Sequence, residues 1–237
     1  MPQTSIGRRG AAEAVGTAML LATVVGSGIM GERLAAGNVA VVLLANTLAT
    51  GAALVALILT FGPVSGAHFN PAVTLADASQ GGLRWRDVPV YLTAQIGGAV
   101  VGVLIAHAMF QERVLMLSVR DRSGAAQMFS EFIATFGLLV VIWGCSRRRS
   151  EAVPFAVGAY ITSAYWFTAS TSFANPAVTV ARALSDTFAG IRPADVPGFI
   201  FAQFAGATAA TLLFRWLVPA LSRTADQVVV PRSEGDY

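Results

Sequence analysis

The 237-residue chain contains no lysine, one cysteine and little charge of either sign. Its single cysteine, Cys145, excludes an internal disulfide and a cluster of cysteine ligands around a metal ion. Charged residues make up 12% of the chain, roughly half the share found in an ordinary soluble domain. The net charge of +3 comes from arginine alone, without a basic stripe that would indicate nucleic-acid binding. We therefore expect no metal, cofactor or nucleic-acid partner.

The chain instead contains long runs of apolar residues. Hydrophobic residues make up 55% of the chain, and the mean hydropathy is +0.63. Several runs approach the roughly 20 residues that a helix needs to cross a bilayer. The polar start is too short for a cleaved signal peptide, so we expect the first run to be retained. The predicted spans are 10–31, 38–61, 89–110, 128–145, 154–169 and 197–221, between tails at 1–9 and 222–237.

One motif occurs twice, 105 positions apart, in the segments 65–76 and 172–183. Both copies contain Asn-Pro-Ala-Val-Thr followed by a short apolar stretch, too short to cross a bilayer. Proline suits the first position of a helix, and asparagine before it is a good N-cap. Each copy therefore predicts a re-entrant half-helix with its asparagine at the positive end. The two triplets are Asn70-Pro71-Ala72 and Asn175-Pro176-Ala177.

The two halves of the chain match beyond the motif. Glu13 aligns with Glu131, and Gln95 aligns with Gln203. Each half consists of helix, helix, half-helix, helix. Because three spans is an odd number, the second half enters from the opposite side of the membrane, and the half-helices meet at the midplane. The predicted parts are a first repeat (10–110), an extracytoplasmic connector (111–127) and a second, inverted repeat (128–221).

Arginine positions predict the orientation. If the N-terminus lies inside, the inner segments hold ten arginines and the outer segments six. This bias favours both termini in the cytoplasm. The inner set is Arg8, Arg9, Arg84, Arg86, Arg147, Arg148, Arg149, Arg215, Arg223 and Arg232, and the outer set is Arg33, Arg113, Arg120, Arg122, Arg182 and Arg192.

This combination resembles the aquaporin and aquaglyceroporin (major intrinsic protein) family, from about residue 10 to residue 221. The resemblance implies an all-α membrane protein with six tilted transmembrane helices and two half-helices around one pore, assembled as a homotetramer. It also implies that Asn70 and Asn175 donate hydrogen bonds to the permeating molecule. Two positive helix ends and two amides at one point would orient a hydroxyl oxygen and repel cations and protons.

Three other polar residues have two interpretations each. Carboxylates at membrane depth are costly, so Glu13 and Glu131 are either a proton relay or buried acceptors for the re-entrant backbone. We favour acceptors, as the family resemblance implies, because irregular backbone in a bilayer must find partners. His68 either lines the inner pore mouth or is a packed, hydrogen-bonded side chain.

The chain departs from water-selective members of this family at the outer constriction. Those members carry an arginine directly after the second Asn-Pro-Ala, where this chain has Val178. The family pattern places the other constriction residues at Thr50, Ser172 and Ser163, with Thr162 as the alternative to Ser163 if the loop spacing differs. This selectivity filter would be wide, weakly polar and without a fixed charge.

Arg182 follows Val178 by about one helical turn on the same face. Its guanidinium group could face the outer vestibule and partly replace the missing charge. Alternatively, it extends along the apolar surface to the lipid headgroups, as long cationic side chains do. We favour the second interpretation.

We therefore predict a passive channel for small neutral solutes, such as glycerol, urea-like molecules and arsenous acid, and for water. Valine after the second motif resembles a bacterial aquaglyceroporin-like subgroup associated with arsenic resistance, which implies the bacterial inner membrane. The alternatives are a water-selective channel and a secondary active transporter, since transporters also use inverted repeats. An enzyme is not expected, because Ser170 and Ser172 have no histidine base nearby in the sequence.

Overall fold

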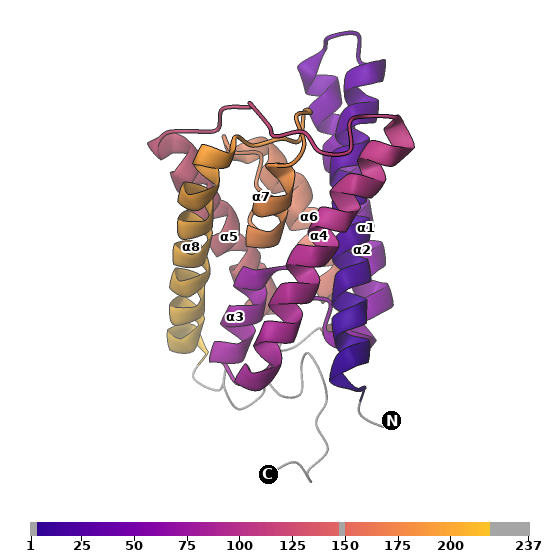
Figure 1. The fold of residues 1–237 in the computed structure, drawn as a ribbon. Coiled ribbons are helices and arrows are strands. Elements are labelled where there is room, and N and C mark those ends of the chain that lie inside the picture. Colours follow the sequence, from indigo (N-terminus) through magenta and orange to yellow (C-terminus); the bar gives the residue numbers. More distant parts are fainter. Residues whose placement is uncertain (1–3, 147–149, 219–237) are drawn as a thin grey trace.

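The computed structural model describes residues 4–146 and 150–218, and all the secondary structure assigned in these ranges is helical. Six longer helices surround two short ones (Figure 1). Single-turn helices η1 (Trp85–Asp87), η2 (Ser150–Ala152) and η3 (Pro193–Asp195) precede three of them. The longer helices are α1 (Ile6–Leu34), α2 (Val39–Ser65), α4 (Val88–Phe110), α5 (Ala125–Ser146), α6 (Val153–Phe167) and α8 (Val196–Leu217), and the short ones are α3 (Pro71–Ser79) and α7 (Pro176–Arg182).

Five of the longer helices, some together with the turn before them, are long and apolar enough to cross a membrane, judged over the described residues. The remaining one, α6, has 15 residues. At 1.5 Å per residue it spans about 22 Å, less than the roughly 30 Å hydrocarbon core of a bilayer. Within the described residues, each of the six expected spans corresponds to one long helix, and α6 is the shortest of them. The five candidate spans are Ile6–Leu34, Val39–Ser65, Trp85–Phe110, Ala125–Ser146 and Pro193–Leu217.

Several helix boundaries differ from the sequence expectation, by up to four residues. The second helix continues through Pro63 and stops only at Gly66, whose φ of 90° lies in the left-handed region that glycine tolerates. Pro63 removes one backbone hydrogen bond and crowds the turn before it, and the helix ends two residues later, at Ser65. The first helix begins at Ile6, so part of the expected tail 1–9 is helical. The expected tail 222–237 lies outside the described residues.

The chain enters and leaves the bundle at the same end (Figure 1). We call the end where α1 begins and α8 ends the inner end, and the end crossed by residues 112–124 the outer end. The two short helices lie near the centre, with α3 toward the inner end and α7 toward the outer end (Figure 1). This arrangement confirms the predicted all-α inverted repeat.

Glycine permits the same close helix crossing in both halves. A Cβ atom at Gly98 would lie 2.2 Å from the carbonyl oxygen of Ala14, where α4 packs on α1. A Cβ atom at Gly206 would lie 2.3 Å from the carbonyl oxygen of Phe132, where α8 packs on α5. Small residues at membrane helix interfaces allow such close backbone approach. These two crossings hold the scaffold into which the half-helices fold.

Candidate functional site

The two half-helices begin as the sequence predicts. The side-chain oxygen of Asn70 accepts a hydrogen bond from the Ala72 amide at 2.9 Å, and that of Asn175 accepts one from the Ala177 amide at 3.0 Å. In each case the residue between them is a proline, which has no N–H to satisfy. Both asparagines therefore cap a helix whose positive end lies at the centre of the protein.

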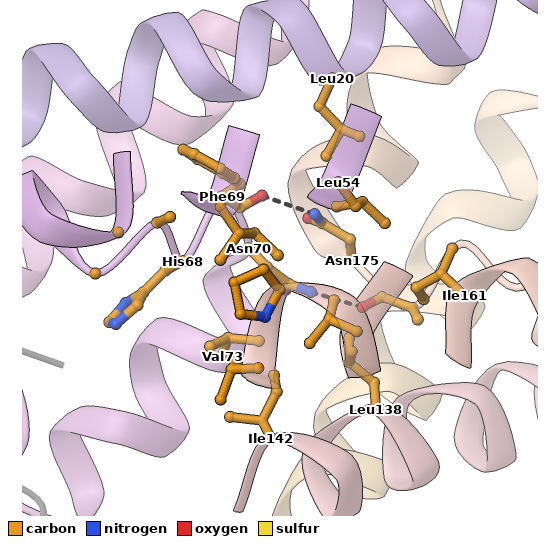
Figure 2. A pocket seen from close by; sticks show the side chains of 18 of the residues that line it. Leu20, Leu54, His68, Phe69, Asn70, Val73, Leu138, Ile142, Ile161 and Asn175 are labelled. Carbon is orange, nitrogen blue, oxygen red and sulfur yellow. Dashed lines mark hydrogen bonds between the residues drawn. The ribbon is translucent and has the colours of Figure 1, made fainter. Parts of the chain in front are cut away.

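Each asparagine also bonds to the opposite half of the chain. The Asn70 Nδ2 group donates to the carbonyl oxygen of Ala174, and the Asn175 Nδ2 group donates to that of Phe69, both at 2.7 Å (Figure 2). An amide nitrogen carries two N–H donors, and each of these bonds uses one. The second donor of each asparagine has no acceptor among the described residues, and both asparagines line the adjoining cavity.

Glu13 supports the backbone that leads into the first half-helix. Its two carboxylate oxygens accept hydrogen bonds from the amides of His68 (3.0 Å) and Phe69 (2.7 Å). They also accept from the Ser65 hydroxyl (2.7 Å) and the Gln95 amide (2.8 Å). Four donors therefore converge on one fully buried carboxylate. Such bonds satisfy backbone groups that a bilayer cannot hydrate.

Glu131 has the corresponding position in the second half. It accepts hydrogen bonds from the amides of Phe173 (2.8 Å) and Ala174 (2.9 Å) and from the Gln203 side chain (2.6 Å). The backbone held in this way is unusual, because Ala174 has a φ of 49°. Non-glycine residues rarely adopt the left-handed region, and surrounding contacts must hold them there. The carboxylate provides such contacts.

A cavity of about 520 Å³ adjoins the half-helices (Figure 2). Both asparagines line it, together with hydroxyl groups and many branched apolar side chains. A mostly apolar wall with a few placed polar groups is typical of sites for small molecules. Its apolar lining includes Leu20, Val24, Leu54, Ile58, Val73, Leu138, Ile142, Val157, Ile161 and Val178.

Three of the four predicted filter residues lie at this cavity. Thr50, Ser172 and Val178 are buried in the protein and line the cavity. Ser163 does not, because its side chain is exposed on the outside of α6 and bonds to the carbonyl oxygen of Tyr160 at 2.7 Å. The structure therefore brings three of these side chains together and places the fourth elsewhere.

On α6, Tyr165 lines the cavity and Ser163 does not. The side chain of Ile161, one turn earlier, also lines the cavity, and the Tyr165 hydroxyl donates to the Thr50 hydroxyl at 3.3 Å. The alternative, Thr162, is half-buried and bonds to the carbonyl oxygen of Gly158. Residues four apart share a helical face, whereas residues two apart point to different sides. The apolar spacing of 157, 161 and 165 was the signal that could have identified Tyr165.

Arg182 lines the cavity and is 1% exposed. Its Nε group donates to the carbonyl oxygen of Ala189, and its guanidinium carbon lies 3.4 Å from the centre of the Phe173 ring. The expectation that it extends to the lipid headgroups is therefore wrong. The helix that carries it ends inside the protein, where the following loop covers it, so its side chain has no path to the headgroups.

His68 lies at the cavity and also has fixed partners. It lines the cavity beside Asn70 (Figure 2). Its Nδ1 atom lies 3.1 Å from the Thr74 hydroxyl, and its Nε2 atom lies 3.7 Å from the Asp77 carboxylate. His68 therefore lines the cavity and is also hydrogen-bonded, so its two interpretations are compatible.

Comparisons with known proteins agree with this architecture. The sequence profile of the family named Major intrinsic protein matches residues 2–162. Aquaglyceroporin AqpS of Rhizobium meliloti (strain 1021) is 53% identical over 218 residues, covering 92% of this chain and 93% of that protein. Aquaporin NIP6-1 of Arabidopsis thaliana is 32% identical over 164 residues, covering 68% of this chain and 53% of that protein. The fold is similar to that of the aquaglyceroporin from Plasmodium falciparum, with a TM-score of 0.73 at 20% identity, covering 92% of this chain and 100% of that chain.

A helical membrane bundle in which two half-helices meet beside a cavity is the architecture of a membrane transport protein. The chain belongs to the Major intrinsic protein family, as the matching profile and the 53% identical relative show. The predicted family and its bacterial aquaglyceroporin subgroup are confirmed. The protein is therefore a passive channel and not an enzyme.

Proposed function

We propose that this channel conducts small neutral molecules rich in hydroxyl groups, namely glycerol-like polyols and arsenous acid, together with water. The observation that carries the proposal is the filter region, where Thr50, Ser172 and Val178 line the cavity. The name of the Rhizobium meliloti relative, an aquaglyceroporin, supports the same solute class.

The chemistry of the cavity suits such solutes. The second amide donors of Asn70 and Asn175 can bind a hydroxyl oxygen, and the hydroxyls of Thr50 and Ser172 can both donate and accept. The apolar wall can contact a carbon backbone without losing hydrogen bonds. Arsenous acid is an uncharged molecule with three hydroxyl groups at neutral pH, so it presents the same acceptors as glycerol at a similar size.

Reconstitution in liposomes tests the proposal directly. Stopped-flow light scattering would record water, glycerol and arsenous acid fluxes in the wild type and in Val178→Arg. We expect the added arginine to lower both solute permeabilities at least about tenfold by filling the filter, and to lower water permeability less. Ser163→Ala is the matched control, because this side chain faces away from the cavity.

Two results would contradict the proposal. Rapid water flux without solute flux in the wild type would indicate the water-selective alternative. Solute accumulation against its gradient, abolished by an uncoupler, would indicate an active transporter.

We also propose that the channel lies in a bacterial plasma membrane with both termini in the cytoplasm. The orientation is supported by the arginine bias of ten inner to six outer residues. Arg122 and Arg182 of the outer set are buried, as is Arg9 of the inner set. Reporter fusions at both ends of the chain would test this orientation. Five of the inner arginines, Arg147, Arg148, Arg149, Arg223 and Arg232, lie outside the described residues.

The family resemblance further supports a homotetramer. Native mass spectrometry of the purified channel is expected to give four copies. A monomer that retains full solute flux would contradict this assembly.

A further inference from the structure

Each half-helix carries one buried charge at the same place in the repeat. Asp77 and Arg182 both follow their asparagine by seven positions, and they are 2% and 1% exposed. Both line the cavity. Asp77 belongs to α3, the half-helix toward the inner end, and Arg182 belongs to α7, the half-helix toward the outer end (Figure 1). The repeat thus places charges of opposite sign at two ends of one cavity.

The partners of these charges also correspond. The Asp77 carboxylate lies 3.7 Å from the ring nitrogen of His68, and the Arg182 guanidinium stacks on the ring of Phe173. His68 and Phe173 are equivalent positions, two residues before their asparagines. Phe173 offers Arg182 a π face and no hydrogen-bond acceptor. The N–H donors of Arg182 therefore need acceptors other than Phe173.

Arg182 lines the cavity and has a donor without a hydrogen-bond partner in the part of the chain that the structure describes. A guanidinium group has five N–H donors. Its Nε donor is used on Ala189, whereas its Nη1 atom is buried and finds no hydrogen-bond partner among the described residues. Leaving a buried donor of a charged group without an acceptor is costly. An acceptor that enters through the cavity would remove this cost.

Arg122 provides an internal comparison on the same ring. It is 9% exposed, and its guanidinium carbon lies 4.8 Å from the centre of the Phe173 ring. Its donors reach the backbone oxygens of Gly190 (2.7 Å), Ser170 (2.9 Å) and Phe188 (3.4 Å), and it does not line the cavity. Arg122 therefore fixes the outer loops, and only Arg182 of this pair faces the cavity.

We propose that Arg182 is a specificity-determining residue of the channel, at a solute site one turn outward from Val178. In this site the guanidinium group donates hydrogen bonds to the hydroxyl oxygens of the passing solute. Its positive charge also opposes the entry of cations from the outer end. The solute role rests on the proposed function, whereas the cation role does not.

The test compares two solutes that differ by a hydroxyl group. Liposomes containing wild type, Arg182→Gln or Arg182→Lys would be assayed for glycerol and propane-1,2-diol permeability and for sodium leak, with protein-free liposomes subtracted. We expect Arg182→Gln to lower the ratio of glycerol to propanediol permeability about tenfold, the loss expected for one hydrogen bond to a charged donor. We also expect its sodium leak to rise about tenfold. Arg192→Gln, the matched control, should leave both values unchanged, because Arg192 is partly exposed and does not line the cavity.

The lysine variant separates the two roles. Arg182→Lys keeps the charge but loses the planar fork of donors, so the sodium leak should stay low while the solute ratio falls. If Arg182→Gln does not assemble, this variant still decides the solute role. An unchanged ratio overturns the donor role, and an unchanged leak in Arg182→Gln overturns the exclusion role. A wild type that passes water but no polyol contradicts the proposed function instead, and the leak measurement still tests Arg182.

Discussion

The two halves of this channel share one scaffold and differ in the side chains that they present to the cavity. Equivalent glutamates, glutamines and threonines hold both half-helices, with nearly the same hydrogen bonds. The differences lie next to the motifs, where Ala67 corresponds to Ser172, His68 to Phe173 and Asp77 to Arg182. The comparison teaches that the repeat defines where the backbone goes, while a few unmatched positions give the inner and outer ends different chemistry.

The threonines show how far the shared scaffold extends. Thr74 donates to the carbonyl oxygen of Asn70 (3.0 Å) and accepts from Gln95 (2.9 Å). In the second half, Thr179 makes the same two bonds, at 2.8 Å each, with Asn175 and Gln203. Both half-helices are thus tied to the last long helix of their own repeat.

The largest expected effect comes from breaking this scaffold at its carboxylates. In Glu131→Gln, the amide side chain retains one oxygen but places N–H donors against backbone N–H groups that were bonded to the carboxylate. Because each hydrogen bond to a charged group contributes about 1.5–3 kcal/mol, we expect a loss of at least about 3 kcal/mol and little assembled protein. Thermal unfolding in detergent and the yield of folded channel would measure this.

If the two halves are equivalent, Glu13→Gln should lower the stability of the channel by a similar amount. Ser65→Ala is the milder control, since it removes only one of the four donors to Glu13. A Glu131→Gln channel with the wild-type unfolding temperature would contradict the structural role of this carboxylate.

A smaller loss is expected where the helices cross. Gly98→Ala and Gly206→Ala each place a Cβ atom against a carbonyl oxygen of the neighbouring helix, so the helices must separate. Overpacking of this kind costs about 1–3 kcal/mol. The adjacent Gly97 is a matched control because nothing lies within 4 Å of a Cβ built there. Unfolding temperatures that fall equally for Gly97→Ala and Gly98→Ala would contradict the close crossing.

Tyr165→Phe sharpens the comparison between α2 and α6, the second helix of each half. Removing the hydroxyl breaks its bond to Thr50 and frees the Thr50 hydroxyl for solute. We expect glycerol permeability to rise about threefold, within the range of one neutral hydrogen bond. Stopped-flow assays of Tyr165→Phe beside Ser163→Ala would measure the effect. Equal glycerol permeabilities of the two variants would contradict the finding that Tyr165, and not Ser163, faces the cavity.

The smallest effect is expected at two ion pairs that the halves also share. Arg84 pairs with Asp87 at 3.3 Å, and Arg192 pairs with Asp195 at 2.9 Å, just before α4 and α8. Both arginines are partly exposed, and each buried carboxylate keeps another donor, the Arg9 guanidinium for Asp87 and the Arg122 amide for Asp195, so losing one arginine should cost little. Arg84→Gln and Arg192→Gln should therefore unfold at the wild-type temperature. A marked drop for either one would show that its ion pair supports the helix start.

Local sequence patterns predicted the half-helices, whereas tertiary packing determined which side chain of α6 faces the cavity and where Arg182 lies. Pro71 and Pro176 begin their helices where the sequence indicates, because capping depends on adjacent residues. Counting back from the motif misplaced the α6 filter residue at Ser163, because the rotation of a helix follows its own buried face. Arg182 was misplaced because its burial depends on Ala189 and Phe173, which the sequence does not bring to it.

The paired bonds between the halves also set the order in which the channel can be completed. Asn70 donates to Ala174, which follows it by 104 residues. A ribosome adding roughly 5–20 residues per second needs about 5–20 s to make that stretch. During this interval, the first half-helix is in the membrane or its translocation machinery without its partner. The two hydrogen bonds that join the half-helices, from Asn70 to Ala174 and from Asn175 to Phe69, therefore cannot form until the second half has been made.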